Sequence, residues 1–216
     1  MDVWYNAKIA MDFHLFTIGH SNIPIDRFVA LLQHAGATTV ADVRSVPASR
    51  RFPWFSKNNL ANRLSQEGIG YLAMGDALGG RPRDERPYCD GVADYEAMAK
   101  EPHYLGGLAR LTAEAARSRI CLMCAEREPL DCHRCLLVAR SLAEGGFAIG
   151  HILHDGAIEP HAETERRLLA LTGEACDLFA SGQHERLAAA YRRRALAVAY
   201  RRPANKPARA CASEHR

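Results

Sequence analysis

The chain has 216 residues, of which 48% are hydrophobic and 25% charged, and its formal net charge is +3. These proportions are ordinary for a globular protein, and the length allows one substantial core with at most a tail beside it. The sequence holds no apolar run near the ~20 residues that span a bilayer, and its N-terminus lacks the basic start and apolar core of a secretion signal. We therefore expect a cytoplasmic protein with no membrane partner.

Short apolar runs alternate along the chain with segments of helical periodicity. The predicted strands are 13–18, 38–43, 69–74, 119–123 and 148–153. The predicted helices are 24–35, 58–67, 95–117 with a break near Pro102 and Gly106-Gly107, 131–144 and 161–171. We expect Asn22 to cap the first helix and Asp131 the fourth, and we expect residues 79–91 to form a mobile loop.

Strands that alternate with helices predict an α/β fold, in which a mainly parallel sheet carries helices on both faces. The α/β domain is expected to cover residues 13–172. Residues 173–216 form a basic extension, with a helix near 180–200 and a disordered end after Pro203. The arginines of this extension are suited to a polyanion, but a solvated tail without a partner fits the sequence equally well.

Polar side chains follow several predicted strands at their carboxyl ends. In a parallel sheet these ends meet at one edge, where ligands bind. The candidates there are His20, Ser21, Asp42, Arg44, Cys124, Glu126, Cys132, His133, Arg134 and His151. Their gathering at one sheet edge predicts a functional site.

Four of the seven cysteines lie between Cys121 and Cys135. Cys132 is expected in the first turn of a helix, where the helix dipole favours a thiolate, with Cys124 facing it from the strand. Cys121 is three residues before Cys124 on that strand, so the two point to opposite faces. Cys135 falls on the inward stripe of the helix.

Cys121 and Cys135 are therefore predicted to be packing residues, which argues against a zinc site made of all four cysteines. A zinc site with Cys124, Cys132 and a histidine stays open, and so does a redox role for the Cys132–Cys135 pair. On this reasoning we assign no metal ligands and no cofactor, and we expect well under one zinc per chain.

A second informative stretch surrounds three aromatic residues with cations. Arg44, Arg50, Arg51 and Lys57 flank Phe52, Trp54 and Phe55. Cations contact phosphates and aromatic rings stack on bases, so this stretch suits a nucleotide or a strand end. An equally acceptable interpretation is a loop whose aromatic rings enter the core while its arginines are solvated.

These stretches resemble the family called Domain of Unknown Function 488. The matching pieces are T-I-G-H-S (17–21), D-V-R-S-x-P (42–47), S-R-R-F-P-x-F (49–55), L-G-G (78–80), C-A-E-R-x-P-x-x-C-H-R (124–134) and H-I-L (151–153). The resemblance runs from about Phe13 to Thr172 and includes the positions of Cys124 and Cys132. It implies an α/β fold and a shared pocket, and leaves the activity unassigned.

The leading hypothesis is an enzyme on a phosphate-bearing substrate, nucleic acid or nucleotide. Cys132 or Cys124 would act as nucleophile or ligand, His133 or His20 would carry protons, and Glu126 would complete the catalytic group. Arg44, Arg51 and Arg134 would hold the anion. Ser21, Asp42, Arg50 and His151 complete the expected binding residues. The alternative is a non-catalytic module that binds nucleic acid or senses metal or thiol oxidation. The sequence leaves the oligomeric state open.

Overall fold

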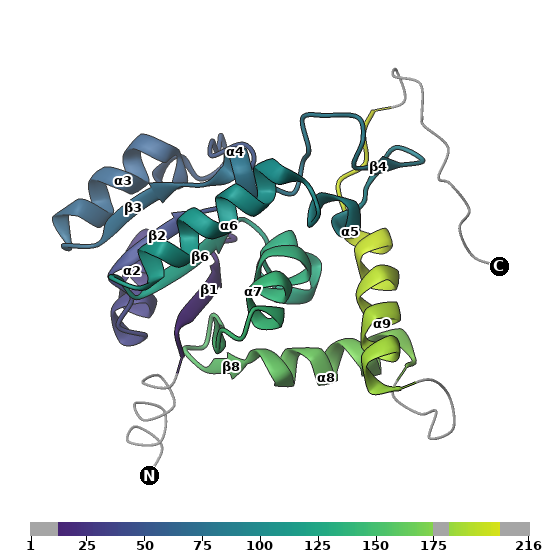
Figure 1. Cartoon of the computed structure of the whole chain (residues 1–216). Coiled ribbons are helices and arrows are strands. Elements are labelled where there is room, and N and C mark those ends of the chain that lie inside the picture. Colours follow the sequence, from purple (N-terminus) through teal and green to yellow (C-terminus); the bar gives the residue numbers. More distant parts are fainter. Residues whose placement is uncertain (1–12, 175–181, 204–216) are drawn as a thin grey trace, which may run out of the picture.

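The structure is a computed structural model that describes residues 13–174 and 182–203 (Figure 1). Its centre is a six-stranded sheet with the order β3-β2-β6-β1-β7-β8. The neighbouring strands run parallel, except that β7 and β8 are antiparallel. The strands are β1 (Leu15–Gly19), β2 (Thr39–Asp42), β3 (Gly70–Ala73), β6 (Ile120–Cys124), β7 (Ile149–Ile152) and β8 (Ile158–Pro160). The predicted α/β class with a mainly parallel sheet is confirmed.

Helices cover both faces of the sheet (Figure 1). Helices α2 (Ile25–His34) and α3 (Lys57–Gln66) pack on one face. The other face carries α4 (Gly75–Leu78), α5 (Tyr95–Met98), α6 (Pro102–Ala115), α7 (Arg140–Glu144), α8 (His161–Thr172) and α9 (Gln183–Val198). A small hairpin joins β4 (Tyr88–Cys89) to β5 (Val92–Ala93). Three short turns of other helix types are η1 (Pro53–Phe55), η2 (Pro129–Asp131) and the π-helix η3 (Arg134–Ala139).

The alternation of side chains along β6 separates its two cysteines. Cys121 is fully buried in the core beneath α2 and α3. Cys124 lies in the opposite core, which also contains Cys135. Period-two alternation thus places Cys121 and Cys124 on different faces, as predicted from their spacing.

Several element boundaries differ from the predictions. Pro24 occupies the cap position of α2, so the prediction of Asn22 as its cap is wrong. The predicted helix over 95–117 breaks before Pro102 and continues through Gly106 and Gly107. Helix α6 needs Gly107 because an added Cβ would lie 2.6 Å from the Cβ of Ala77, where α4 packs. Strands β4, β5 and β8 were not predicted, since each has only two or three residues.

The basic extension contributes to the same core as the sheet. In α9, Ala190 and Tyr191 are buried against the core that also holds α8 (Figure 1). Its arginines have partners within the body of the protein: Arg192 with Glu96, Arg193 with the carbonyl of Thr172, and Arg194 with Asp131. The predicted start of this helix and the residues after Pro203 lie outside the described parts of the chain.

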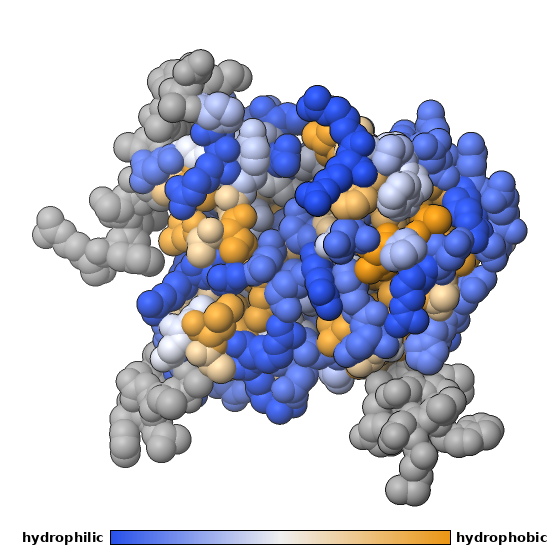
Figure 2. Space-filling view, turned by 180° about the vertical axis from the view of Figure 1, so that it is seen from behind, coloured by the Kyte–Doolittle hydropathy of each residue, from blue (hydrophilic) through white to orange (hydrophobic). Residues whose placement is uncertain are grey.

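No helix within the described ranges is both long and apolar enough to cross a membrane. On the face drawn in Figure 2, hydrophobic residues form separate patches among hydrophilic ones. The large hydrophobic side chains that are exposed, including Val46, Trp54 and Leu196, come from different elements.

Candidate active site

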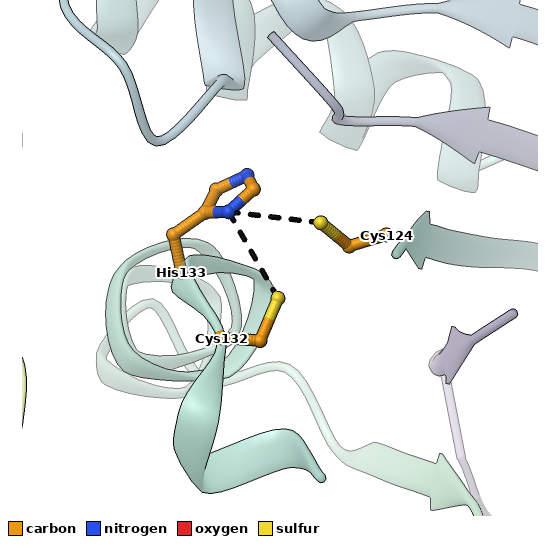
Figure 3. Close-up of side chains that lie close together, drawn as sticks. All are labelled: Cys124, Cys132 and His133. Atoms are coloured by element: carbon orange, nitrogen blue, oxygen red, sulfur yellow. Dashed lines mark hydrogen bonds between the residues drawn. The ribbon is translucent and has the colours of Figure 1, made fainter. Parts of the chain in front are cut away.

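Two cysteines and a histidine meet where β6 ends and the following helix begins (Figure 3), and a glutamate contacts both sulfur atoms. Cys124 is the last residue of β6, and Glu126 follows in the loop. Cys132 comes directly after the 3-10 turn η2, and His133 immediately precedes η3. The C-A-E-R-x-P-x-x-C-H-R motif therefore supplies all four side chains from one loop.

Cys132 occupies the cap position of the helical segment that begins at His133 and continues as η3. Its backbone is extended (φ −139°, ψ 138°), and its carbonyl accepts the N–H groups of Cys135 and Leu136. Its Sγ accepts the N–H of Arg134 at 3.4 Å. The prediction that Asp131 caps this helix is wrong, because Pro129 starts a separate turn that Asp131 ends, and Asp131 pairs with Arg194 instead.

Glu126 and His133 each lie close to both sulfur atoms. Glu126 Oε2 is 2.9 Å from the Sγ of Cys124 and 3.1 Å from that of Cys132. The Nδ1 atom of His133 is 3.8 Å from Cys124 Sγ and 3.9 Å from Cys132 Sγ (Figure 3). The ligand atoms of Cys124, Cys132 and His133 all lie within 4.8 Å of each other, close enough to share a metal ion.

The ring of His133 is fixed in orientation. Its Nε2 lies 2.9 Å from the backbone carbonyl of Val43, which can only accept a hydrogen bond. Nε2 therefore carries a proton, and Nδ1 faces the two sulfur atoms. On one side the ring packs against Gly80, where an added Cβ would lie 2.6 Å from His133 Cγ. Gly80, the second glycine of the L-G-G motif, is thus required because any larger side chain would meet the ring of His133.

The two thiols differ electrostatically although they are neighbours. Burial acts to raise the pKa of Cys132, but a hydrogen bond from Cys124 and the positive charges of Arg134 and His133 hold it well below 9. The hydrogen bond with Cys132, together with burial, raises the pKa of Cys124. Burial also raises the pKa of Glu126. In metal-free protein Cys132 is therefore the more acidic thiol of the pair.

The four residues line an open pocket of about 280 Å³. Its wall includes Arg44 and Ser45 after β2, Arg81 from the loop after Gly80, and Tyr200 after α9. The guanidinium of Arg81 lies 4.7 Å from the centroid of the Tyr200 ring, and no described acidic residue forms a salt bridge with it. The pocket therefore has a reactive floor and an available cation in its wall.

Arg44 belongs to a buried network beside the pocket. Its guanidinium pairs with Asp42 at 2.6 Å, donates to the Phe55 carbonyl at 2.8 Å, and lies 3.1 Å from Nε2 of His20. Because an arginine only donates, His20 accepts there, and burial together with the Arg44 charge lowers its pKa to about 4. Tyr71 donates to Asp42 at 2.7 Å. His20 is thus uncharged at neutral pH, and its ring contacts Arg44 rather than the thiols.

The remaining predicted residues do not line the pocket. Arg134 is buried behind it and donates to the carbonyls of Glu126 and Arg127. Ser21, with φ 43°, contacts Asn22. Arg50 and Arg51 are exposed on the loop before η1. His151 is fully buried within β7 and hydrogen-bonds to Thr17 and His161.

Of the aromatic residues before α3, one ring enters the core and another is exposed, so each of the two interpretations holds for part of this stretch. Phe55 is fully buried and stacks on His20 with ring centroids 4.1 Å apart. Trp54 is 40% exposed, and Arg51 lies over the ring of Phe52. One ring thus supports the site from within, while another remains open to solvent.

Sequence reasoning missed Arg81, Tyr95, Val198 and Tyr200, all of which line the pocket. Arg81 is a single arginine in a loop, and Tyr200 lies far along the chain from the motif that ends at Arg134. Neither residue stands in a local sequence pattern that would predict a shared pocket wall.

Comparison with known proteins places most of the pocket floor within one family pattern. A family model described as "Domain of unknown function DUF488" matches residues 24–141, which include Arg44, Gly80 and the loop from Cys124 to Arg134. No curated protein and no solved structure matches the chain.

Proposed function

Because the chain belongs to the DUF488 family, whose description names no activity, we propose a function from the site itself: an enzyme that acts on a phosphate-bearing substrate. The observation that carries the proposal is the convergence of two thiols, an imidazole and a carboxylate on the floor of an open pocket. Perturbed ionisable groups gathered in a concave site are the usual mark of a catalytic centre.

The charge of the wall supports an anionic substrate. Arg81 lines the pocket and is free of salt bridges to the described acidic residues, so its guanidinium can meet a phosphate. Arg44 adds positive charge, although its own donors are directed to Asp42, Phe55 and His20. A volume of about 280 Å³ suits a small group such as a nucleotide end.

A titration of mononucleotides and inorganic phosphate, combined with a screen for turnover of phosphate-bearing compounds, tests this proposal. Arg81→Ala should weaken binding by roughly tenfold, since a charged hydrogen bond is lost. Arg51→Ala is the matched control, because Arg51 lies outside the pocket lining. Absence of binding by the wild type in low salt, or an effect of Arg51 that exceeds that of Arg81, would contradict the proposal.

A second candidate is a non-catalytic module that binds single-stranded nucleic acid. The exposure of Trp54 beside Phe52 and Arg51 favours it, because an exposed ring next to a cation can stack on a base. In the same titration, Trp54→Ala would then weaken a long single strand while leaving a mononucleotide unaffected. Under the enzyme proposal the reverse ranking holds, with Arg81 dominant.

A further inference from the structure

We propose that Cys124, Cys132 and His133 bind a zinc ion whose open coordination position faces the pocket, with Glu126 beside it. This inference rests on the proposed function, since it names the cofactor of the same site. It also reverses the low zinc content expected from the sequence, because the fold assembles the mixed ligand set that the sequence left open.

The distances fit tetrahedral zinc. Zinc binds sulfur at about 2.3 Å and nitrogen at about 2.0 Å, which places a sulfur and a nitrogen ligand roughly 3.6 Å apart. The Nδ1 atom of His133 lies 3.8 Å and 3.9 Å from the two Sγ atoms. Shifts of a few tenths of an ångström would bring both sulfur–nitrogen distances to that value.

The orientation of His133 is that of a metal ligand. Its Nε2–H donates to the carbonyl of Val43, so when Nδ1 gives up its proton, as a metal ligand must, the lone pair of Nδ1 points toward the sulfur atoms (Figure 3). Metal-binding histidines generally donate their other N–H to a carbonyl or carboxylate in this way. Nothing but the two thiols lies within hydrogen-bonding distance of Nδ1 among the contacts of the described residues.

A neighbouring group of similar composition shows the contrast. Cys135, His151 and His161 also lie close enough to share a metal ion. Their ring nitrogens, however, are all engaged in one buried chain of hydrogen bonds. The chain runs Thr17, His151, His161, Tyr191 and Glu165.

The direction of this chain follows from its end. Tyr191 donates to Glu165, so it accepts from His161 Nε2. His161 Nδ1 then accepts from His151 Nε2, and His151 Nδ1 accepts from Thr17. Every ring nitrogen has a partner, and a metal would have to break the bond between the two histidines. We therefore assign zinc to the first group alone.

The proposed zinc site leaves one coordination position free on the side of the pocket. Cys124, Cys132, His133 and Glu126 all line the pocket, and Glu126 does not belong to the set of mutually close ligand atoms. Three protein ligands leave the fourth position to water or substrate. A bound zinc would supply a more acidic water at this position, and the Glu126 carboxylate lies beside the two sulfur ligands, where it could accept a proton. Zinc enzymes that deaminate nucleobases use this same combination of cysteines, histidine and a separate glutamate.

The zinc content of the purified full chain, measured by mass spectrometry without added metal or chelator, tests the inference. We expect about one zinc per chain, as in other sites with three protein ligands. Cys124→Ser and Cys132→Ser should each lose it. Cys135→Ser is the matched control: it removes a buried thiol from the neighbouring group and should retain the zinc. Circular dichroism shows whether each variant is folded.

Wild-type protein that is purified without zinc and takes up neither zinc nor cobalt would overturn the inference. So would loss of zinc from Cys135→Ser with retention in Cys132→Ser. If the serine variants do not fold, cobalt-substituted wild type decides, because absence of thiolate-to-cobalt absorption would overturn the assignment. Phosphate titration of the same sample tests the proposed function separately, so a metal-free protein that binds phosphate through Arg81 would refute only the zinc.

Discussion

Cys132 and Cys124 show how position separates two chemically identical groups. Cys132 caps a helix, accepts the N–H of Arg134 and has a lowered pKa, whereas the pKa of Cys124 is raised by its bond to Cys132. Cys121 and Cys135 are fully buried, and burial raises the pKa of each. Reactivity should therefore differ among four thiols within fifteen residues of sequence.

In metal-stripped protein, iodoacetamide should modify Cys132 faster than Cys121 or Cys135. A thiol with an ordinary pKa reacts about tenfold more slowly for each pH unit below that pKa, because the thiolate is the reactive form. Because the pKa of Cys132 is lowered, its rate should fall less between pH 8 and about pH 6 than the rate of a thiol with an ordinary pKa. Peptide mapping at both pH values gives the measurement. Modification of Cys135 at the rate of Cys132 would sink this assignment.

The sequence predicted that Cys121 is a packing residue, because its spacing from Cys124 places the two on opposite faces of one strand. It also predicted that Cys124 and Cys132 face each other across the loop that joins them. It could not predict that Nδ1 of His133 faces the sulfur atoms, because the carbonyl that fixes the ring belongs to Val43, ninety residues away. That contact directs Nδ1 of His133 toward the two sulfur atoms, where the proposed zinc would bind.

The elements themselves were largely predictable, but the helix after Cys132 was not. Its apolar stripe predicted a regular helix from Asp131, whereas the chain forms the turn η2, the cap at Cys132 and then the π-helix η3. π-helices occur as short insertions, often at functional sites, and leave no periodic signal in so few residues. The arrangement turns Cys132 and His133 toward the pocket while Cys135 enters the core.

The loop that holds Gly80 should position His133 for metal binding. Gly80→Ala would push a methyl group into the His133 ring, so we expect weaker zinc affinity by tenfold or more in competition with a chelator. Gly106→Ala is the matched control: Gly106 lies in α6 with open space around its Cα, and the change should stabilise the helix by about 0.5–1 kcal/mol. Unchanged zinc affinity in Gly80→Ala would show that the ring is not held by this contact.

At the scale of the whole molecule, the extension after residue 173 completes the pocket. Tyr191 is buried between α8 and the core, and Val198 and Tyr200 line the pocket beside the cysteines. The charge pattern of the sequence pointed to a separate basic tail. It could not show the partners of Arg192, Arg193 and Arg194, since these lie on distant elements.

Tyr191→Ala should therefore destabilise the entire fold. Loss of a buried aromatic side chain costs about 3–5 kcal/mol, and the hydrogen bonds to His161 and Glu165 are lost with it. Leu196→Ala, at a 56% exposed position of the same helix, should cost far less. Urea unfolding of both variants provides the comparison. Equal stability of Tyr191→Ala and wild type would mean that α9 adds little to the core.

The segment from Cys124 to His133 is proposed to form a zinc centre in the pocket. A crystal structure with anomalous diffraction recorded on both sides of the zinc absorption edge tests it most directly. We expect one anomalous difference peak enclosed by Cys124 Sγ, Cys132 Sγ and His133 Nδ1, with its open side toward Arg81 and Tyr200. A Cys124–Cys132 disulfide, or a peak between Cys135, His151 and His161 with none at the first group, would contradict it.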